Sequence, residues 1–141
     1  MCQQGDAPNT VINTCNGFYC DNWLGSHFSQ FPHQPAMWTE DWLGWFQHWS
    51  EPLVHRPPQD VAFAVLRWVA RGGTHHNYYM FHGGTTFARW VGGPFIMTSY
   101  NYDAGLDEYG FENEPKYTHL ANMHDIIMAF SPALLNNSVP T

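Results

Sequence analysis

The chain has 141 residues, of which 44% are hydrophobic, 17% aromatic and only 12% charged. This composition is sufficient for one domain with a hydrophobic core and argues against a disordered chain. Its net charge of −7 argues against binding to nucleic acid or to an anionic membrane surface, because polyanions do not attract an acidic protein. The many rings suggest instead a surface for a neutral ligand.

Short runs of β-branched and aromatic residues predict three strands. They lie at residues 11–15, 35–40 and 74–81. Between and after them, segments rich in Gly, Pro and polar residues predict loops at residues 16–34 and 82–114, and at most one helical turn is predicted over residues 42–49. No run of about 18 apolar residues occurs, so no membrane-spanning helix is predicted.

Two helices are predicted from capping signals and from apolar residues at helical spacing. The first opens at Pro57-Pro58-Gln59-Asp60 and stops at Gly72-Gly73. The second opens at Pro115 and ends at Ser131-Pro132. Their apolar faces are formed by Val61, Val65, Trp68 and Val69 in the first helix, and by Leu120, Met123, Ile127 and Phe130 in the second.

The resulting order is strand, strand, helix, strand, helix, with polar and aromatic residues directly after the strands. This order is typical of an α/β barrel, whose active sites lie at the carboxyl ends of its strands. A (β/α)8 TIM barrel needs eight strands and about 250 residues. This chain supplies three strands and the tail of a fourth at Met1-Cys2. We therefore expect residues 1–141 to be the closing, C-terminal portion of a larger barrel.

The segment Trp38-Thr39-Glu40-Asp41-Trp42-Leu43-Gly44-Trp45-Phe46 combines an acidic pair with four aromatic rings. Glu40 follows an apolar run, as a carboxylate at the end of a strand would. A carboxylate can react at an anomeric carbon, and flat rings can stack on the C–H faces of a sugar. The alternative is a solvated Glu beside tryptophans that pack in the core.

Cysteines and histidines give weaker signals. Cys2, Cys15 and Cys20 are too few, and odd in number, for a disulfide framework. Cys15 and Cys20 could pair, or both could be buried free thiols. His75 and His76 are adjacent on a predicted strand, so they point to opposite faces and cannot both bind one ion. No metal site and no cofactor are predicted.

Several segments, in order along the chain, resemble the β-galactosidases of glycoside hydrolase family 35, and most closely its plant-like branch. They are Val11–Cys20, Trp38–Phe46, Asn77–Thr85, Gly93–Tyr100, Asp107–Gly110 and Glu114–Tyr117. The resemblance implies a (β/α)8 barrel and hydrolysis of β-galactosides with retention. It also implies that this chain runs from about the end of strand 5 through helix 8, with strands 1–4 missing.

The same resemblance implies roles for individual residues. Glu40 matches the nucleophile in the family's Thr-Glu-x-x-x-Gly-Trp motif after the seventh strand. Trp42 and Trp45 match aromatic positions at the galactose pocket, Tyr79 a tyrosine that hydrogen-bonds near the nucleophile, and Tyr102 a tyrosine that touches the sugar. The family's acid/base Glu follows the fourth strand and is absent from this chain, so the 141 residues alone are expected to be inactive.

Other acidic residues are weighed separately. Glu114 follows an Asn, as the family's acid/base does, but it precedes the last helix and is interpreted as structural. Glu51 and Asp60 are interpreted as solvated or helix-start acids. Asp21, Asp41 and Asp103 flank ring-rich segments and could hydrogen-bond sugar hydroxyls, although Asp41 is expected rather to orient its loop.

Two further readings stay open at this point. One is a non-catalytic or degenerate carbohydrate-binding barrel fragment, and the other is a structural fragment that pairs with another chain. The start Met1–Asp6 lacks the basic and apolar regions of a signal peptide, so the protein is either not secreted or lacks its true N-terminus here. The family and the sequon Asn136-Asn137-Ser138 favour the secretory pathway, with an extracellular, cell-wall, lysosomal or vacuolar destination.

Overall fold

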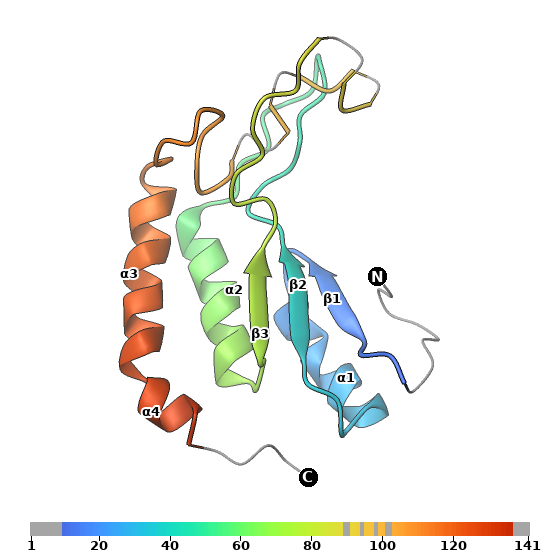
Figure 1. Cartoon of the computed structure of the whole chain (residues 1–141), viewed down its shortest axis with the longest axis vertical. Helices are drawn as coiled ribbons and strands as arrows, with labels where there is room; N and C mark the ends of the chain where they lie inside the picture. The colour runs from blue at the N-terminus through green and yellow to red at the C-terminus, as the bar shows by residue number, and fades with distance from the viewer. Residues whose placement is uncertain (1–9, 89–90, 94, 98, 101–102, 137–141) are drawn as a thin grey trace.

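The protein is described by a computed structural model over residues 10–88, 91–93, 95–97, 99–100 and 103–136. It is an α/β structure in which three strands form one parallel sheet of order β1-β2-β3 (Figure 1). In chain order its elements are β1 (Thr14–Gly17), the 3-10 helix η1 (Cys20–Asn22), α1 (Leu24–Gln30), β2 (Met37–Asp41), α2 (Pro58–Ala70), β3 (His75–Tyr78), α3 (Lys116–Ala129) and α4 (Ser131–Leu134). The predicted strand tail at Met1-Cys2 lies outside the described residues.

The register of the sheet brings the carboxyl ends of all three strands to one edge. Trp38 of β2 pairs with Cys15 and His76, and Asp41 pairs with Gly17 and Tyr78. The long loops that follow β2 and β3 therefore leave the sheet side by side and rise together above it (Figure 1). They are joined farther along by an antiparallel bridge between His48 and Ile96.

The core lies between the sheet and its helices. Trp38 and Trp68 are fully buried and their ring centroids are 5.4 Å apart, which joins β2 to α2. A second cluster packs α2 against α3 through Val61, Val65 and Leu120. On the strands themselves, residues such as His75 and Asn77 remain exposed, so only one face of the sheet is covered by the described residues.

The predicted helix after the second strand is confirmed as α2. It begins at Pro58, with Asp60 in its first turn, and ends before Gly72. Val61, Val65 and Trp68 are buried and Val69 is partly buried, so the spacing identified the buried face. This prediction succeeded because proline, acid and glycine signals agreed with the apolar period.

The first strand lies later in the chain than predicted, and the prediction of a loop after it was wrong. Pairing with β2 places β1 at Thr14–Gly17, and Val11 and Ile12 are each 46% exposed, since β-propensity does not hold residues that lack a partner strand. Within the predicted loop 16–34 the structure has η1 and α1. Burial of Leu24 and His27 stabilises α1 although its polar composition gave no helical signal.

Three further predictions need correction. Residues 42–49 form no helical turn, because their backbone pairs instead with the loop after β3, as in the bond from Trp49 N–H to the Phe95 carbonyl (2.8 Å). β3 ends at Tyr78 rather than Phe81, where its pairing with β2 ends. Phe130 follows the end of α3 and is 61% exposed, so it does not belong to the buried face of that helix.

Cys15 and Cys20 form a disulfide that ties β1 to η1, which decides between the two readings of these cysteines. Both residues are buried in the core cluster that contains Trp38. None of the helices in the described part of the chain is long and apolar enough to cross a membrane.

Candidate active site

Glu40 lies at the carboxyl end of β2, partly buried, with its carboxylate held by a neighbouring indole. Trp42 Nε1–H donates to Glu40 Oε2 at 3.1 Å. The backbone of Glu40 is also fixed, because Trp38 Nε1–H donates to its carbonyl at 2.8 Å. A carboxylate that is accessible yet oriented by a hydrogen bond has the geometry that a nucleophile requires.

Aromatic rings surround Glu40, as the sequence pattern suggested. Trp42 and Trp45 make an edge contact with centroids 4.6 Å apart, and Phe18 meets the edge of Trp42 at 5.2 Å. Trp45 also packs against Phe46 at 5.0 Å. The rings therefore brace one another and present partly exposed faces beside the carboxylate.

The hollow that these loops enclose is too small for a sugar. It is lined by Gly44, Trp45, Phe46, Tyr79 and Tyr100 and has a volume of about 10 Å³, about the space that one water molecule occupies. The described residues thus provide one wall of a pocket rather than a closed pocket.

Tyr79 lies in this wall, and its hydroxyl is hydrogen-bonded to the hydroxyl of Tyr100 at 3.2 Å rather than to Glu40. That hydrogen bond raises the pKa of Tyr79 to about 12, with smaller contributions from burial and from the charges of Tyr100 and Glu40. Tyr79 is therefore protonated at neutral pH, and the charge of Glu40 acts on its hydroxyl. Tyr102, the remaining predicted sugar contact, lies outside the described residues.

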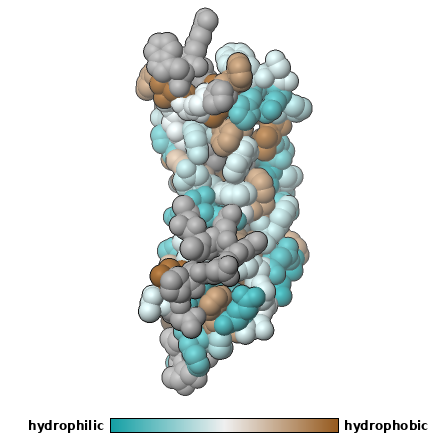
Figure 2. Space-filling model, turned by 90° about the vertical axis from the view of Figure 1, so that its right-hand side faces the viewer, coloured by the Kyte–Doolittle hydropathy of each residue, from teal (hydrophilic) through white to brown (hydrophobic). Residues whose placement is uncertain are grey.

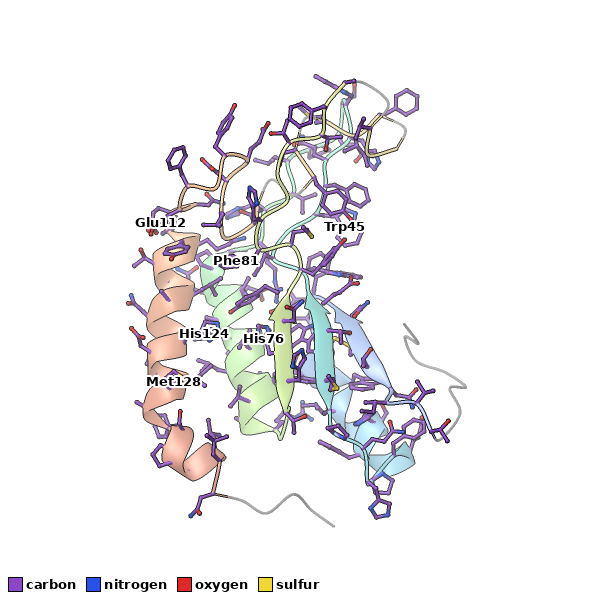
Figure 3. All side chains as sticks on the ribbon, viewed as in Figure 1. Trp45, His76, Phe81, Glu112, His124 and Met128 are labelled. Carbon is purple, nitrogen blue, oxygen red and sulfur yellow. A yellow bond between two sulfur atoms is a disulfide. The ribbon has the colours of Figure 1, made fainter. Side chains whose placement is uncertain are left out.

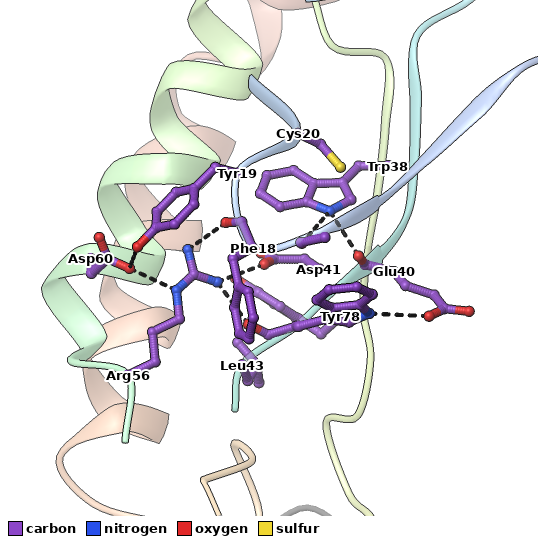
Figure 4. Close-up of polar contacts among 12 residues, drawn as sticks. Phe18, Tyr19, Cys20, Trp38, Glu40, Asp41, Leu43, Arg56, Asp60 and Tyr78 are labelled. Atoms are coloured by element: carbon purple, nitrogen blue, oxygen red, sulfur yellow. Dashed lines mark hydrogen bonds and ion pairs between the residues drawn. The ribbon is translucent and has the colours of Figure 1, made fainter. Parts of the chain in front are cut away.

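Behind Glu40, a buried ion cluster is centred on Asp41, which is fully buried. Its Oδ1 accepts from Arg56 Nη1 at 2.9 Å and its Oδ2 from His76 Nε2 at 2.9 Å. Because a carboxylate can only accept, the Nε2 of His76 carries the proton in this contact. Figure 4 shows Arg56 and its partners, with the carboxylate of Glu40 pointing away from Arg56. The expectation that Asp41 orients the loop agrees with these contacts.

His76 also belongs to a row of rings that reaches α3. Tyr78 meets His76 edge-on at 4.4 Å, and the hydroxyl of Tyr78 is hydrogen-bonded to His124 Nε2 at 2.8 Å. Burial, followed by the charge of His76, lowers the pKa of His124. Figure 3 shows His76 and His124 at the same level, between β3 and α3.

Asp21 and Asp103 do not face a sugar, contrary to the possibility raised from the sequence. Asp103 accepts from Lys116 Nζ and from the backbone N–H of Arg56, each at 2.5 Å. Asp21 is 1% exposed and pairs with Arg67 at 3.1 Å. Burial lowers the pKa of Lys116, and the charge and hydrogen bond of Asp103 oppose that shift. Both carboxylates are thus buried and ion-paired, although neither oxygen of Asp21 accepts a hydrogen bond in the described structure.

The remaining acids behave as the sequence analysis interpreted them. Glu114 accepts from the backbone N–H of Thr118 at 3.2 Å and also from its hydroxyl, which satisfies donors at the start of α3. Glu51 is exposed and pairs with His48 at 2.9 Å. Within the part of the chain that the structure describes, no group of three or more His, Cys, Asp or Glu residues could hold a metal ion.

Sequence reasoning missed Arg56, which lies 15 residues from Asp41 in the chain. One signal was available. The chain has only five Lys and Arg residues against twelve Asp and Glu residues, so each Lys or Arg is a candidate partner for an acidic side chain. Of these, Arg56 and Lys116 are buried and ion-paired. Their partners could not be identified without the fold, since both pairings are long-range.

Comparison with known proteins places this site in a family. The sequence profile of glycosyl hydrolases family 35 matches residues 1–127. The "Probable beta-galactosidase 2" of Dictyostelium discoideum is 51% identical over 140 residues, 99% of this chain but 18% of that protein. The "Beta-galactosidase 6" and "Beta-galactosidase 3" of Oryza sativa subsp. japonica are 54% and 53% identical over 135 residues, 96% of this chain and 15% of each. The chain thus spans less than a fifth of the length of these curated relatives.

Proposed function

This chain belongs to glycosyl hydrolases family 35, and from that membership we propose that it is part of a β-galactosidase. The reaction is hydrolysis of terminal non-reducing β-D-galactosyl residues of oligosaccharides or polysaccharides, with retention at the anomeric carbon. The names of three relatives, each a β-galactosidase at 51–54% identity, support this substrate class. The acidic surface charge is compatible with a neutral sugar.

The 141 residues form the C-terminal portion of the catalytic (β/α)8 barrel, from about the end of strand 5 through helix 8. In this proposal β1, β2 and β3 are strands 6, 7 and 8, and strands 1–4 come from residues outside this segment. A parallel sheet with helices on one face supports the assignment. So does a hollow of about 720 Å³ beside β1, which is lined in part by Tyr19, Trp23 and Phe31.

Glu40 is the proposed nucleophile. The observation that carries this assignment is its carboxylate, placed at the end of β2 and oriented by Trp42 Nε1–H at 3.1 Å. Its oxygen attacks the anomeric carbon while a second carboxylic acid protonates the departing glycosidic oxygen, and water then cleaves the galactosyl ester. The two carboxyl groups must lie about 5–5.5 Å apart. The second one comes from outside these residues, so this segment alone is inactive.

Trp42, Trp45, Tyr79 and Tyr102 form the proposed galactose-binding side of the site. Trp45 offers a partly exposed ring for stacking on the apolar face of a sugar. Tyr79, whose pKa is raised to about 12, keeps its proton and can donate to the ligand or to Glu40 when the pocket is complete. We further propose a destination in the secretory pathway, either extracellular and cell-wall or lysosomal and vacuolar, which the Cys15–Cys20 disulfide supports.

The test is hydrolysis of a chromogenic β-galactoside by two chains: this segment, and a version extended upstream through the fourth strand of the barrel. Each is compared with its Glu40→Gln variant, which keeps the shape of the side chain but removes the attacking oxyanion. We expect activity only in the extended chain and its loss in the variant, by at least about 10⁴-fold. A 2-deoxy-2-fluoro-galactoside should also label Glu40, as located by mass spectrometry.

Two outcomes would contradict the proposal. An extended chain that folds but does not hydrolyse any β-galactoside would indicate a degenerate, sugar-binding barrel. An extended chain that keeps its rate after Glu40→Gln, or that is labelled at another carboxylate, would remove Glu40 from the nucleophile role.

A further inference from the structure

Arg56 lies where the carboxyl ends of two strands meet the start of α2. Its guanidinium donates to Asp41 Oδ1 at 2.9 Å and to the carbonyl oxygens of Trp42 and Phe18 at 2.8 and 2.7 Å, while its Nε–H donates to Asp60 at 2.7 Å. The side chain is only 5% exposed. Because the guanidinium is planar and rigid, it fixes these four groups relative to one another.

His76 holds the same carboxylate from the neighbouring strand. Its Nε2–H donates to Asp41 Oδ2 at 2.9 Å, and its side chain is 13% exposed. Asp41 therefore accepts from Arg56 on one oxygen and from His76 on the other. The residue that directly follows Glu40 is thus tied to β3 and to Arg56 in the segment just before α2, and its side chain cannot rotate without breaking an ion pair.

These contacts reach Glu40 through its two neighbours along the chain. Asp41 is the next residue, and Trp42, whose carbonyl Arg56 holds, donates its indole N–H to Glu40 Oε2. On its β3 side β2 is irregular between Trp38 and Asp41, so in the described sheet Glu40 has its register partner in β1, where it pairs with Asn16. The ion cluster therefore adds a constraint on the segment that directly follows Glu40.

We propose that Arg56 and His76 are positioning residues for the nucleophile: acting through Asp41 and Trp42, they hold the Glu40 carboxylate in its attacking orientation. This inference rests on the proposed function. Stability alone does not account for the cluster, because replacing a buried ion pair with apolar residues is often neutral or stabilising. The buried charges instead hold a fixed geometry behind the nucleophile.

The first test uses the full-length chain that carries this segment and measures kcat and KM for an aryl β-galactoside. Arg56→Lys keeps the charge but loses the planar set of donors, and we expect kcat to fall about 10- to 100-fold with KM nearly unchanged. The control is Arg67→Met, which removes a different arginine, on α2 and 41% exposed, from its ion pair with a buried carboxylate, Asp21, and which has no ion pair with Asp41. We expect the control to keep kcat.

The second test replaces His76. His76→Gln can still donate to Asp41 and should keep kcat within about threefold, whereas His76→Leu cannot and should lower kcat about tenfold or more. Labelling with the 2-deoxy-2-fluoro-galactoside counts the folded, competent sites, so kcat is expressed per site. If Arg56→Lys does not fold, the comparison of His76→Gln with His76→Leu tests the positioning role by itself.

Three results would overturn the inference. They are an unchanged kcat in both Arg56→Lys and His76→Leu, a fall in Arg67→Met that equals the fall in Arg56→Lys, and losses that appear only in KM. In each case a wild-type chain that is active and dependent on Glu40 shows that the proposed function survives. A wild-type chain without Glu40-dependent activity overturns both proposals.

Discussion

Trp42 contributes to the site in two separable ways. Its indole N–H donates to Glu40 Oε2 at 3.1 Å, and its ring packs edge-on against Trp45 and Phe18. The hydrogen bond orients the carboxylate, so its loss frees the side chain. Loss of orientation lowers the rate, because a displacement of about 1 Å can cost about 100-fold in rate.

Trp42→Phe in the full-length chain is therefore expected to lower kcat about tenfold and to leave KM within about twofold, since the ring remains and only the donor is lost. Trp45→Phe is the matched control, because no hydrogen bond joins Trp45 to Glu40 in the described structure. It should raise KM several-fold and keep kcat. Steady-state kinetics with one aryl β-galactoside measures both. Equal effects of the two variants on kcat would contradict a separate role for the Trp42 donor.

At the scale of the elements, the turn between α2 and β3 depends on a close approach of Gly73 to the ring of Trp68. A Cβ at Gly73 would lie 2.2 Å from the indole of Trp68. The same indole donates to the carbonyl of His75 at 3.1 Å, so the ring cannot move aside without losing that bond. α2 can therefore connect to β3 through this short turn only because residue 73 has no side chain.

Gly73→Ala is expected to destabilise the protein by about 1–3 kcal/mol, because the added methyl group overpacks a buried ring. Gly25→Ala in α1 is the control, since a Cβ there meets nothing within 4 Å, and it should stabilise by about 0.5–1 kcal/mol through helix propensity. Denaturant midpoints of the full-length variants, followed by tryptophan fluorescence, measure both. A Gly73→Ala variant as stable as the wild type would show that the turn can relax.

At the scale of the whole molecule, the described residues leave apolar surface and strand backbone uncovered. β1 pairs only with β2 in the described sheet, and Val11 and Ile12 beside it are 46% exposed. On the outer side of α3, Met128 is 68% exposed (Figure 3). Figure 2 shows apolar residues between polar ones on the side that faces β1, mostly over the loops. Such edges and patches favour association.

The 141-residue segment alone is therefore expected to self-associate, and the chain extended through the whole barrel is expected to lose this tendency. Size-exclusion chromatography with light scattering at several concentrations measures the mass of each species. The extended chain is the control for association through loops and α3, because it retains them. A segment that stays monodisperse and monomeric would contradict the assignment of β1 as an edge strand of an incomplete barrel sheet.

Much of the candidate site could be predicted from local sequence. Glu40, Trp42 and Trp45 occur within six residues, and a strand that ends at a carboxylate places the neighbouring rings beside it whatever the rest of the fold. α2 was predictable for the same reason, since Pro58, Asp60 and the spacing of Val61 and Val65 all act within one helix. The roles of Glu40, Trp42, Trp45 and Tyr79 stay predictions until the kinetic tests are made.

The sequence by itself therefore determined the α/β class, α2 and the family to which the chain belongs, because each depends on short-range patterns of residues. Only the tertiary structure decided that Asp41 is held by Arg56 and His76, that Asp21 and Asp103 form ion pairs with Arg67 and Lys116, and that residues 24–30 are helical. The ion pairs join residues that lie between 13 and 46 positions apart in the chain. Their pairing free energy exists only once the strands are in register, so no local propensity could reveal it.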